Sequence, residues 1–366
     1  MRLHKLKNIL EEHGLNSLIV SYEWNVNYYL KLPRASGTFI IVESEATPKV
    51  LTPALDLWRV SNHVKSKVEV LPYAGYELPG LDVKPITGKV SDWVINYLRS
   101  SKARKVGLDL SYVTSLNHEL QMRLANEVEV VDVGPSIAAQ RSVKEPEEVE
   151  HIKKALSIAE TAFVRVLENG VLGRSEAEVS ALIDSNMRLR GAEGIAFDTI
   201  VASGPNSAYP HAYPTDRVLT EGDLVVVDFG ARVNSYCSDT TRSLRMGKVE
   251  PEAMKALEAV KEALLESTEL IREGVQSSEP DSKARDVLRK YGLDKYFIHS
   301  LGHGVGVEVH EKPRLAQGSE DVLVEGMVVT VEPGVYIPGR YGVRLENLVL
   351  VRKSGYEVLN KLPLIF

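Results

Sequence analysis

The first 140 residues alternate between two hydrophobic patterns. Leu3 to Leu15 carries apolar residues three and four positions apart, which is typical of an amphipathic helix. Helix-like stretches such as 91–100 lie between short apolar runs of the kind that form buried strands. Those runs cover residues 17–22, 38–43, 49–53, 68–73, 105–110 and 128–133. Strands alternating with helices predict an α/β domain over residues 1–140.

The pattern changes at residues 142–150. Ser142 or Lys144 stands before Pro146, and two glutamates follow in the next turn, which together form a helix-start signal. We therefore predict a domain boundary near residue 140 and a second domain over residues 141–366.

The second domain mixes long helices with strands. One helix is predicted to about Glu168, and another begins at Ser175, with Glu178 three residues on as in a capping box. Two more helices are predicted at 251–273 and 280–291, whereas the stretch after about residue 195 and the C-terminal part are strand-rich. A hairpin turn is expected near Arg232–Ser235. This mixture predicts an α+β domain.

Length and charge narrow the classes of function. A chain of 366 residues favours two domains. Its 44 basic and 50 acidic residues give a net charge of −6, which argues against a general affinity for nucleic acid. The single cysteine, Cys237, fits a reducing compartment, and no apolar stretch reaches the roughly 18–20 residues needed to cross a membrane. We expect a cytoplasmic protein with no nucleic-acid or membrane partner.

Five acidic or imidazole residues stand in unusual places in the second domain. Asp228 ends the apolar run LVVV, and Asp239 follows 11 residues later; His303 lies between two glycines. Glu332 ends the run MVVTV, and Glu346 follows 14 residues later between apolar neighbours. A carboxylate at the end of a buried strand is costly unless it is paired or binds a cation.

Together these five residues favour a metal site with two ions. Four carboxylates balance two divalent cations, and one histidine adds a neutral ligand of the kind that manganese, cobalt, iron and zinc accept. Two such ions roughly 3.5–4 Å apart can share a water and lower its pKa. Taken singly, each residue also fits an ordinary turn, cap, strand-end or core position, so the interpretation depends on their order and spacing.

The five residues in this order resemble the ligands of the pita-bread metallopeptidases, which include methionine aminopeptidase, aminopeptidase P, prolidase and creatinase. The run EWNVNYYL at 23–30 is similar to the smaller N-terminal domain of the prolidases. The resemblance implies an α/β creatinase-like domain followed by an α+β pita-bread domain that holds two divalent metal ions per subunit. Manganese or cobalt is expected first, with zinc or iron as alternatives.

Two histidine-containing segments, PHAYPTDRVL and GHGVGVEVHE, resemble the proline-specific branch. The resemblance implies that Glu332 passes a proton from the attacking water to the leaving nitrogen, and that His310 binds the substrate carbonyl or oxyanion. It also implies that His211 contacts the substrate near the departing proline. Proline has no N–H, so ordinary recognition of the peptide backbone fails, and the departing nitrogen must be protonated.

Other residues receive subsidiary roles. Arg314 is a candidate clamp for the carboxylate of a dipeptide, or else an ordinary surface arginine. Thr241, His299 and Arg344 are expected to orient the metal ligands from behind. Asn347 departs from the family, where Asp often follows the last Glu ligand, and this removes one charge near the site. Cys237 is expected to be a small buried residue rather than a ligand.

The expected activity is that of an Xaa-Pro dipeptidase, or prolidase, whose substrate is a small peptide with proline in the second position. The close alternative is an Xaa-Pro aminopeptidase that acts on longer peptides. A creatinase-like amidinohydrolase fits less well because the full ligand set is present. A pita-bread binding protein without catalysis also fits less well, for the same reason. The resemblance further implies a homodimer.

Overall fold

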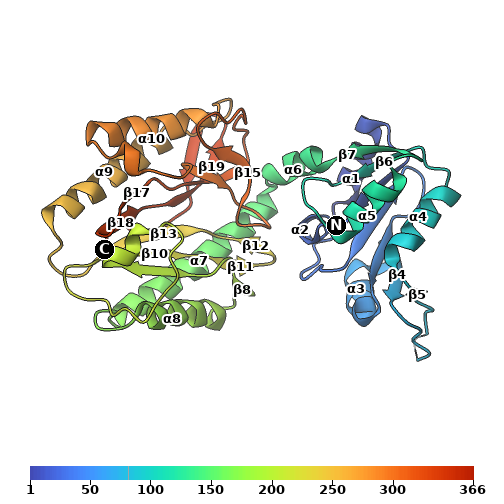
Figure 1. The fold of residues 1–366 in the computed structure, drawn as a ribbon, viewed down its shortest axis with the longest axis horizontal. Coiled ribbons are helices and arrows are strands. Elements are labelled where there is room, and N and C mark those ends of the chain that lie inside the picture. The colour runs from blue at the N-terminus through green and yellow to red at the C-terminus, as the bar shows by residue number, and fades with distance from the viewer. Residues whose placement is uncertain (81) are drawn as a thin grey trace. The chain divides into compact units, whose positions relative to one another are not determined.

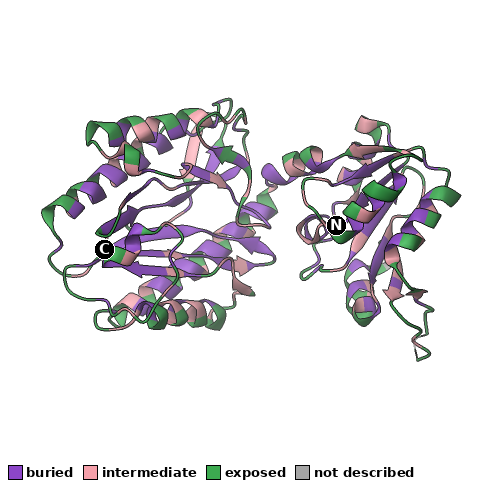
Figure 2. Cartoon of the chain, viewed as in Figure 1, coloured by how far each residue is buried: buried purple, intermediate pink, exposed green. Residues whose placement is uncertain are grey.

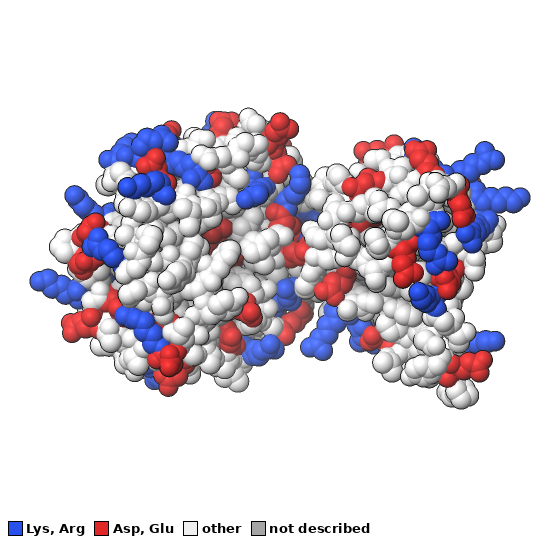
Figure 3. All heavy atoms as spheres, in the orientation of Figure 1, with Lys and Arg blue, Asp and Glu red and all other residues white. Residues whose placement is uncertain are grey.

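The computed structural model of the chain describes residues 1–80 and 82–366. The chain forms two compact units, Met1–Arg141 and Ser142–Phe366 (Figure 1). On the face of each unit drawn in Figure 3, basic and acidic side chains are interspersed. Among the described residues, no helix is both long enough and apolar enough to cross a bilayer.

A mixed sheet organises the first unit. Its strands within the described residues lie in the order β5-β4-β3-β2-β1-β6-β7. The pairs β1–β2 and β2–β3 are antiparallel, and the others are parallel. The strands are β1 (Ser17–Val20), β2 (Phe39–Glu43), β3 (Lys49–Pro53), β4 (Glu69–Ala74), β5 (Ile86–Thr87), β6 (Lys105–Leu108) and β7 (Glu129–Asp132).

Helices pack their apolar faces against this sheet. Val94, Ile95 and Leu98 of one helix join Ile19 and Leu108 of the strands in one buried cluster. Figure 2 shows the strands buried and the outer faces of the helices exposed. The helices are α1 (Leu3–His13), α2 (Glu23–Leu30), α3 (Leu57–Val64), α4 (Val90–Ser100), α5 (Ser115–Leu124) and α6 (Gly134–Ser142), with short 3-10 turns η1 (Ala54–Asp56) and η2 (Lys65–Lys67).

Every apolar run predicted as a strand in this unit forms one, and Leu3–His13 and Val90–Ser100 form helices where these were expected. The strand β5 was not predicted, because two residues carry no periodic signal.

Two pairs of helices enclose the strands of the second unit. In Figure 1 the pair α7–α8 lies on one side of these strands, and the pair α9–α10 lies on the other. The helices are α7 (Pro146–Glu168), α8 (Glu176–Leu189), α9 (Pro251–Thr268) and α10 (Ser278–Lys290), with 3-10 turns η3 (Gly204–Ala208) and η4 (Asp294–Tyr296).

The strands of the second unit form small antiparallel sheets, ordered β13-β10-β9, β12-β11-β8, β15-β14-β16-β19-β20 and β17-β18 within the described residues. The first two of these sheets contain β8 (Gly194–Ile195), β9 (Ile200–Ser203), β10 (Leu224–Phe229), β11 (Ala231–Val233), β12 (Tyr236–Cys237) and β13 (Thr240–Arg245). The other two sheets contain β14 (Gly302–Gly304), β15 (Glu311–Leu315), β16 (Val328–Val331), β17 (Gly334–Ile337), β18 (Tyr341–Arg344), β19 (Asn347–Arg352) and β20 (Gly355–Val358).

Local signals account for several boundaries in this unit. Ser175 Oγ accepts the amide of Glu178, whose carboxylate accepts the amide of Ser175, so the capping box predicted for α8 is confirmed. The predicted hairpin is also confirmed: Asn234 and Ser235 have φ of 48° and 72°, as a two-residue loop of the primed type requires.

Helix α7 begins at Pro146, as the helix-start signal predicted, but the predicted cap residues Ser142 and Lys144 are wrong. Glu145 caps this helix instead, and the carboxylate of Glu148 reaches back to accept the amide of Glu145, as in a capping box. Lys144 is buried instead and pairs with Glu311 at 2.7 Å.

Helix α9 ends at Thr268, short of the predicted residue 273. The hydroxyls of Ser267 and Thr268 donate back to the carbonyls of Ala263 and Leu264. Such bonds compete with the helical pattern and suit a helix end.

Candidate metal centre

Two neighbouring strands bring the aspartates of the candidate site together. Asp228 lies on β10, opposite Thr241 of β13, and opposite residues in an antiparallel pair project to the same face. Asp239 immediately precedes β13. A tight hairpin between the two aspartates therefore returns the chain to the same end of the sheet.

The glutamates follow the same plan in another sheet. Val331 of β16 pairs with Asn347 of β19, and continuing this register by one residue sets Glu332 opposite Glu346. His303 lies on β14, which pairs with β16 through Gly304 and Val329. The amide of Glu346 donates to the carbonyl of Thr241 at 3.1 Å, which joins the two sheets at the site.

Ligand atoms of these residues gather within a small volume. Atoms of Asp228, Asp239 and Glu346 all lie within 4.8 Å of one another, and so do atoms of Asp239, His303 and His310. Asp239 is common to both groups.

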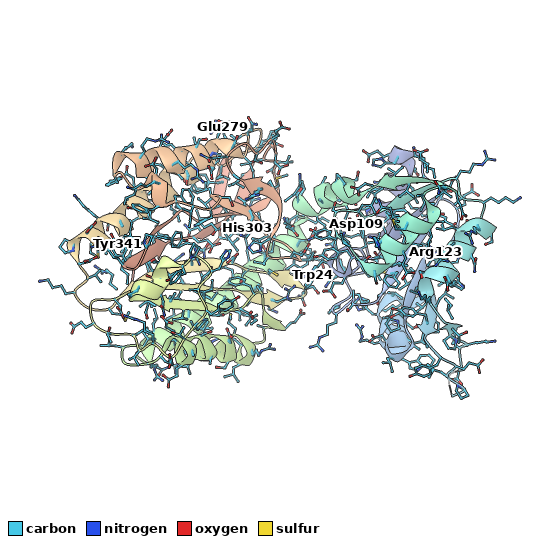
Figure 4. The ribbon with its side chains drawn as sticks, viewed as in Figure 1. Trp24, Asp109, Arg123, Glu279, His303 and Tyr341 are labelled. Carbon is cyan, nitrogen blue, oxygen red and sulfur yellow. The ribbon has the colours of Figure 1, made fainter. Side chains whose placement is uncertain are left out.

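Glu332 belongs to the same cluster through the histidine. His303 Nε2 lies 3.2 Å from Glu332 Oε1 and 3.7 Å from Asp239 Oδ2. Figure 4 labels His303 among the strands of the second unit. The structure thus brings together all five residues predicted as ligands, from segments more than 100 positions apart in the sequence.

Two carboxylate oxygens in this cluster are buried without a hydrogen-bond partner. They are Asp228 Oδ1 and Glu346 Oε1. A buried charged oxygen without a donor is strongly unfavourable, so the arrangement fits a site that binds cations. The donor set of four carboxylates and one imidazole suits hard or borderline divalent ions.

The pKa values reflect this crowding of negative charge. Burial raises the pKa of Asp239 and of Glu346 well above the usual carboxyl range, and the neighbouring carboxylates raise both further. Glu332 behaves differently. Burial acts to raise its pKa, but the hydrogen bond and charge of His303 outweigh burial and lower the pKa to about 2. A cation that binds here would therefore compete with protons for these carboxylates.

The imidazole of His303 is oriented for ligation. Its Nδ1 lies 3.1 Å from the carbonyl oxygen of Gly304, and a carbonyl can only accept, so Nδ1 carries the hydrogen. In the neutral ring, Nε2 then presents its lone pair to the carboxylate cluster. The amide of His303 donates to Thr330 Oγ1, which in turn donates to Glu332 Oε1 at 3.1 Å.

A network behind the carboxylates contains the three residues predicted to orient them. Thr241 Oγ1 donates to Glu346 Oε2 at 2.9 Å and accepts from Arg344 Nε at 3.2 Å. Arg344 Nη2 donates to Asp228 Oδ2 at 2.7 Å. One guanidinium and one hydroxyl thus fix an oxygen on each of two candidate ligands.

Tyr336 completes this network and was not predicted from the sequence. Its hydroxyl accepts from Arg344 Nη1 at 2.8 Å and lies 2.9 Å from His299 Nε2. His299 Nδ1 lies 2.8 Å from the carbonyl of Ser300, so Nδ1 donates and Nε2 accepts from the tyrosine. His299 is therefore linked to the cluster through Tyr336 and Arg344.

Two further histidines border the cluster. The rings of His303 and His310 meet edge to face with centroids 4.3 Å apart. Burial of the ring, together with the nearby His303 and His211, lowers the pKa of His310 to about 4. His211 is exposed, and its neighbour Pro210 accepts a hydrogen bond from Arg344 Nη1 at 3.1 Å.

Arg314 lies at the edge of the site. Its position on β15 is opposite His303 on β14, although the register shifts just beyond this pair. Its amide donates to Asp321 Oδ2 at 3.1 Å, and the residue is exposed.

Cys237 is buried, and its Sγ donates to the carbonyl of Val307 at 3.7 Å.

A second buried arginine lies behind Glu346. Arg242 is fully buried and donates to the carbonyls of Glu346, Leu362 and Pro363. Its Nη2 also lies 3.2 Å from Asn347 Oδ1, so a neutral amide faces this cation where the family often has a carboxylate. Burial lowers the pKa of Arg242 to about 10.

The C-terminal segment 360–363, which Arg242 contacts, is also bound by Glu160 of α7. The carboxylate of Glu160 accepts the amides of Lys361 and Leu362 and the side-chain amide of Asn360. The backbone of these residues is thereby fixed directly behind a candidate ligand.

Comparison with known families identifies this architecture. The model of metallopeptidase family M24 matches residues 150–353, and that of the Creatinase/Prolidase N-terminal domain matches residues 2–143. The chain belongs to metallopeptidase family M24. The predicted fold class, a creatinase-like α/β domain followed by a pita-bread α+β domain, is confirmed for this metallopeptidase.

The metallopeptidase resembles its relatives over nearly its whole length. It is 37% identical to the Xaa-Pro dipeptidase of Pyrococcus furiosus over 98% of this chain and 97% of that protein. A solved Xaa-Pro dipeptidase from Bacillus anthracis is 31% identical, with a TM-score of 0.88 and coverage of 100% and 99%. A solved X-Pro aminopeptidase from Thermotoga maritima is 31% identical, with a TM-score of 0.83 and coverage of 96% and 97%.

Proposed function

We propose that the protein is a metal-dependent Xaa-Pro dipeptidase. The observation that carries this proposal is the cluster of Asp228, Asp239, His303, Glu332 and Glu346, with His211 and His310 at its border. The full-length similarity to Xaa-Pro dipeptidases supports the same activity.

The five clustered residues would hold two divalent metal ions, with manganese or cobalt first and zinc or iron as alternatives. The buried oxygens Asp228 Oδ1 and Glu346 Oε1, which lack protein donors, support this assignment. When bound, the ions would act as Lewis acids and lower the pKa of a nucleophilic water.

The protein's own groups would handle the proton and the carbonyl oxygen. Glu332 would carry the proton to the proline nitrogen, since an amide nitrogen leaves only when protonated. Its Oε1 accepts a hydrogen bond from Thr330 Oγ1 at 3.1 Å, which fixes where the proton is picked up. His310, with a pKa of about 4, is neutral at pH 7 and would offer an uncharged N–H donor to the carbonyl oxygen.

Selection of a short substrate would depend on His211 and Arg314. His211 would contact the proline side of the substrate, next to the carbonyl of Pro210 that Arg344 holds. Arg314 would pair with the free carboxylate of a dipeptide, which its exposed position opposite His303 supports. Thr241, His299 and Arg344 would keep the ligands in place.

The first experiment compares substrates in metal-free protein reloaded with manganese or cobalt. We expect hydrolysis of Met-Pro and Leu-Pro, with a longer Xaa-Pro peptide and Leu-Ala cut far more slowly. Preference for the longer peptide would instead establish an Xaa-Pro aminopeptidase, the activity named for the Thermotoga maritima structure. Cleavage of neither proline substrate would contradict both assignments.

We also propose a cytoplasmic homodimer in which residues 1–140 form the creatinase-like domain and residues 141–366 the catalytic domain. The family membership and the single cysteine of the chain support these assignments. Light scattering during gel filtration measures the oligomeric state.

A further inference from the structure

The segment from Gly204 to Arg217 carries His211 and lies between β9 and β10. Both stems of this segment contact the same side chain, Glu176, the first residue of helix α8. Glu176 lies outside the metal cluster, and the proposed reaction gives it no chemical role. It is nevertheless a fully buried carboxylate, with 0% of its surface exposed.

Each oxygen of Glu176 serves one stem of the segment. Oε1 accepts the amide and the hydroxyl of Ser203, both at 2.7 Å. Oε2 accepts the amide of Thr215 at 3.0 Å and its hydroxyl at 2.6 Å. Asn206 Nδ2 donates to both oxygens, at 3.2 and 3.1 Å. One carboxylate therefore joins the end of β9 to the residue four positions after His211.

This arrangement requires the ionised carboxylate. Burial acts to raise the pKa of Glu176, but the bonds from Thr215 and Ser203 outweigh it, and the pKa is lowered. Each carboxylate oxygen accepts a backbone amide, which can only donate, so a carboxamide at this position would set its own NH2 against one of these N–H groups. The geometry thus requires a charged acceptor rather than any polar side chain.

Other contacts fix the segment between α8 and the metal centre. The guanidinium of Arg217 forms a double ion pair with Asp223 at 2.7 and 2.8 Å. On the side of the metal centre, the amide of Gly342 donates to Ser207 Oγ at 2.7 Å. A Cβ on Gly342 would lie only 1.9 Å from the carbonyl oxygen of Ser207, so the segment packs directly on β18.

The residues between these anchors project outward. Tyr209 and Tyr213 are 63% and 80% exposed, and His211 between them is exposed as well. Ordering such a segment from a flexible state would cost conformational entropy at every substrate encounter. A segment fixed beforehand avoids that cost.

We propose that Glu176 is a positioning residue that holds the His211 segment in its substrate-binding form before the peptide arrives. The part of this inference that concerns peptide binding rests on the proposed Xaa-Pro dipeptidase function, whereas the ordering of the segment does not. Glu176 acts through His211 and touches neither the metal ligands nor the substrate.

The test compares Glu176→Gln with Glu178→Gln in the metal-loaded protein. Glu178 is a matched control, since it lies two residues away on α8 and its carboxylate only caps the helix at the surface. Hydrogen exchange of the amides in residues 204–217 is measured first, without substrate. We expect exchange to accelerate about tenfold or more in Glu176→Gln, and to stay unchanged in Glu178→Gln.

Kinetics then separate positioning from a general structural defect. We expect Glu176→Gln to raise KM for Leu-Pro about tenfold or more, with kcat changed less and the bound metal unchanged. Because Glu176 acts through His211, the double variant with His211→Ala should show a KM no worse than that of the poorer single variant. Additive effects, unchanged exchange, or loss of metal would each overturn the proposal.

A further variant covers the case in which Glu176→Gln fails to fold. Glu176→Asp keeps the charge with a shorter reach, and we expect intermediate exchange and an intermediate KM. Wild-type behaviour of Glu176→Asp in both measurements would contradict the proposal. If the wild-type enzyme cleaves no Xaa-Pro peptide, the proposed function fails, and the exchange experiment alone still decides whether Glu176 orders the segment.

Discussion

Asp228 is a carboxylate whose two oxygens have different surroundings. Oδ2 accepts from Arg344 at 2.7 Å, whereas Oδ1 is buried without a hydrogen-bond partner. Burial raises its pKa even though Arg344 opposes the effect. The charge that the protein leaves unbalanced at this residue is what a cation would balance. His310 borders the same cluster but has a different proposed role, because it can donate a hydrogen bond to the substrate without binding metal.

These two residues give a paired prediction. We expect Asp228→Asn to lower metal occupancy and abolish hydrolysis, and His310→Ala to keep the metal but lower kcat by about 10²–10³-fold. Metal analysis and steady-state rates measure both effects. Asp286→Asn is the control, because Asp286 is exposed on α10 and pairs only at the surface. A fully active Asp228→Asn enzyme would contradict the assignment.

The sequence predicted the candidate ligands because some interrupt an apolar pattern and because all five follow a recognisable order and spacing. Asp228 and Glu332 end hydrophobic strands, where a charge has a visible cost. Tyr336 and Thr330 carry no such signal, since a hydroxyl on a strand is ordinary whichever way it points. Glu176 was hidden for another reason: acidic residues are common in the first turn of a helix, so its burial could not be inferred.

Among the elements, α8 bears most directly on the proposed substrate segment. Its capping box could be predicted because Ser175 and Glu178 have the required identities and spacing. The cap of α7 could not, because Glu145 is not a favoured N-cap type. Short strands such as β8 (Gly194–Ile195) and β12 (Tyr236–Cys237) were also beyond prediction, since they exist only through their pairing partners.

The cap of α8 gives a prediction about stability. Ser175→Ala removes the acceptor for the amide of Glu178, and we expect it to destabilise the catalytic unit by about 1 kcal/mol. Ser185→Ala on the same helix is the control, because Ser185 is exposed and its hydroxyl only returns to the carbonyl of Leu182. Urea unfolding of both variants measures the difference. Equal midpoints would show that the cap contributes nothing.

For the molecule as a whole, the division into two units places the candidate catalytic groups in one unit and a separate buried carboxylate, which affects stability, in the other. The candidate metal centre lies entirely within residues 142–366. The first unit has its own buried charge, Asp109, labelled in Figure 4, whose Oδ1 has no hydrogen-bond partner and whose Oδ2 accepts from Asn25. A change of pattern in the sequence predicts a boundary near residue 140, whereas a lone buried Asp within the first unit shows no signal.

Asp109 makes the stability of the first unit depend on pH. Burial raises its pKa to about 6, above the value of about 3.9 in an unfolded chain. Between these values the folded state binds a proton that the unfolded state releases, so this group's contribution falls as pH rises. In the wild type, this group lowers the free energy of unfolding by about 3 kcal/mol as pH rises from 4 to 7. We expect Asp109→Asn to abolish this decrease.

Urea unfolding of wild type and Asp109→Asn at intervals across that range measures the effect. The difference between the two proteins isolates Asp109 from the other carboxylates. A difference that does not vary with pH would contradict the shifted pKa.

The buried tail behind Glu346 has a consequence for how the sequence can vary. Arg242 donates to the carbonyls of Leu362 and Pro363, and Glu160 accepts the amides of Lys361 and Leu362. These hydrogen bonds are made to backbone carbonyls and amides, so they depend on the path of the backbone and not on the identity of its side chains. Mutational drift at the exposed positions Lys361 and Pro363 should therefore be tolerated, while insertions or deletions there should be purged, because a change of path reaches the metal ligands.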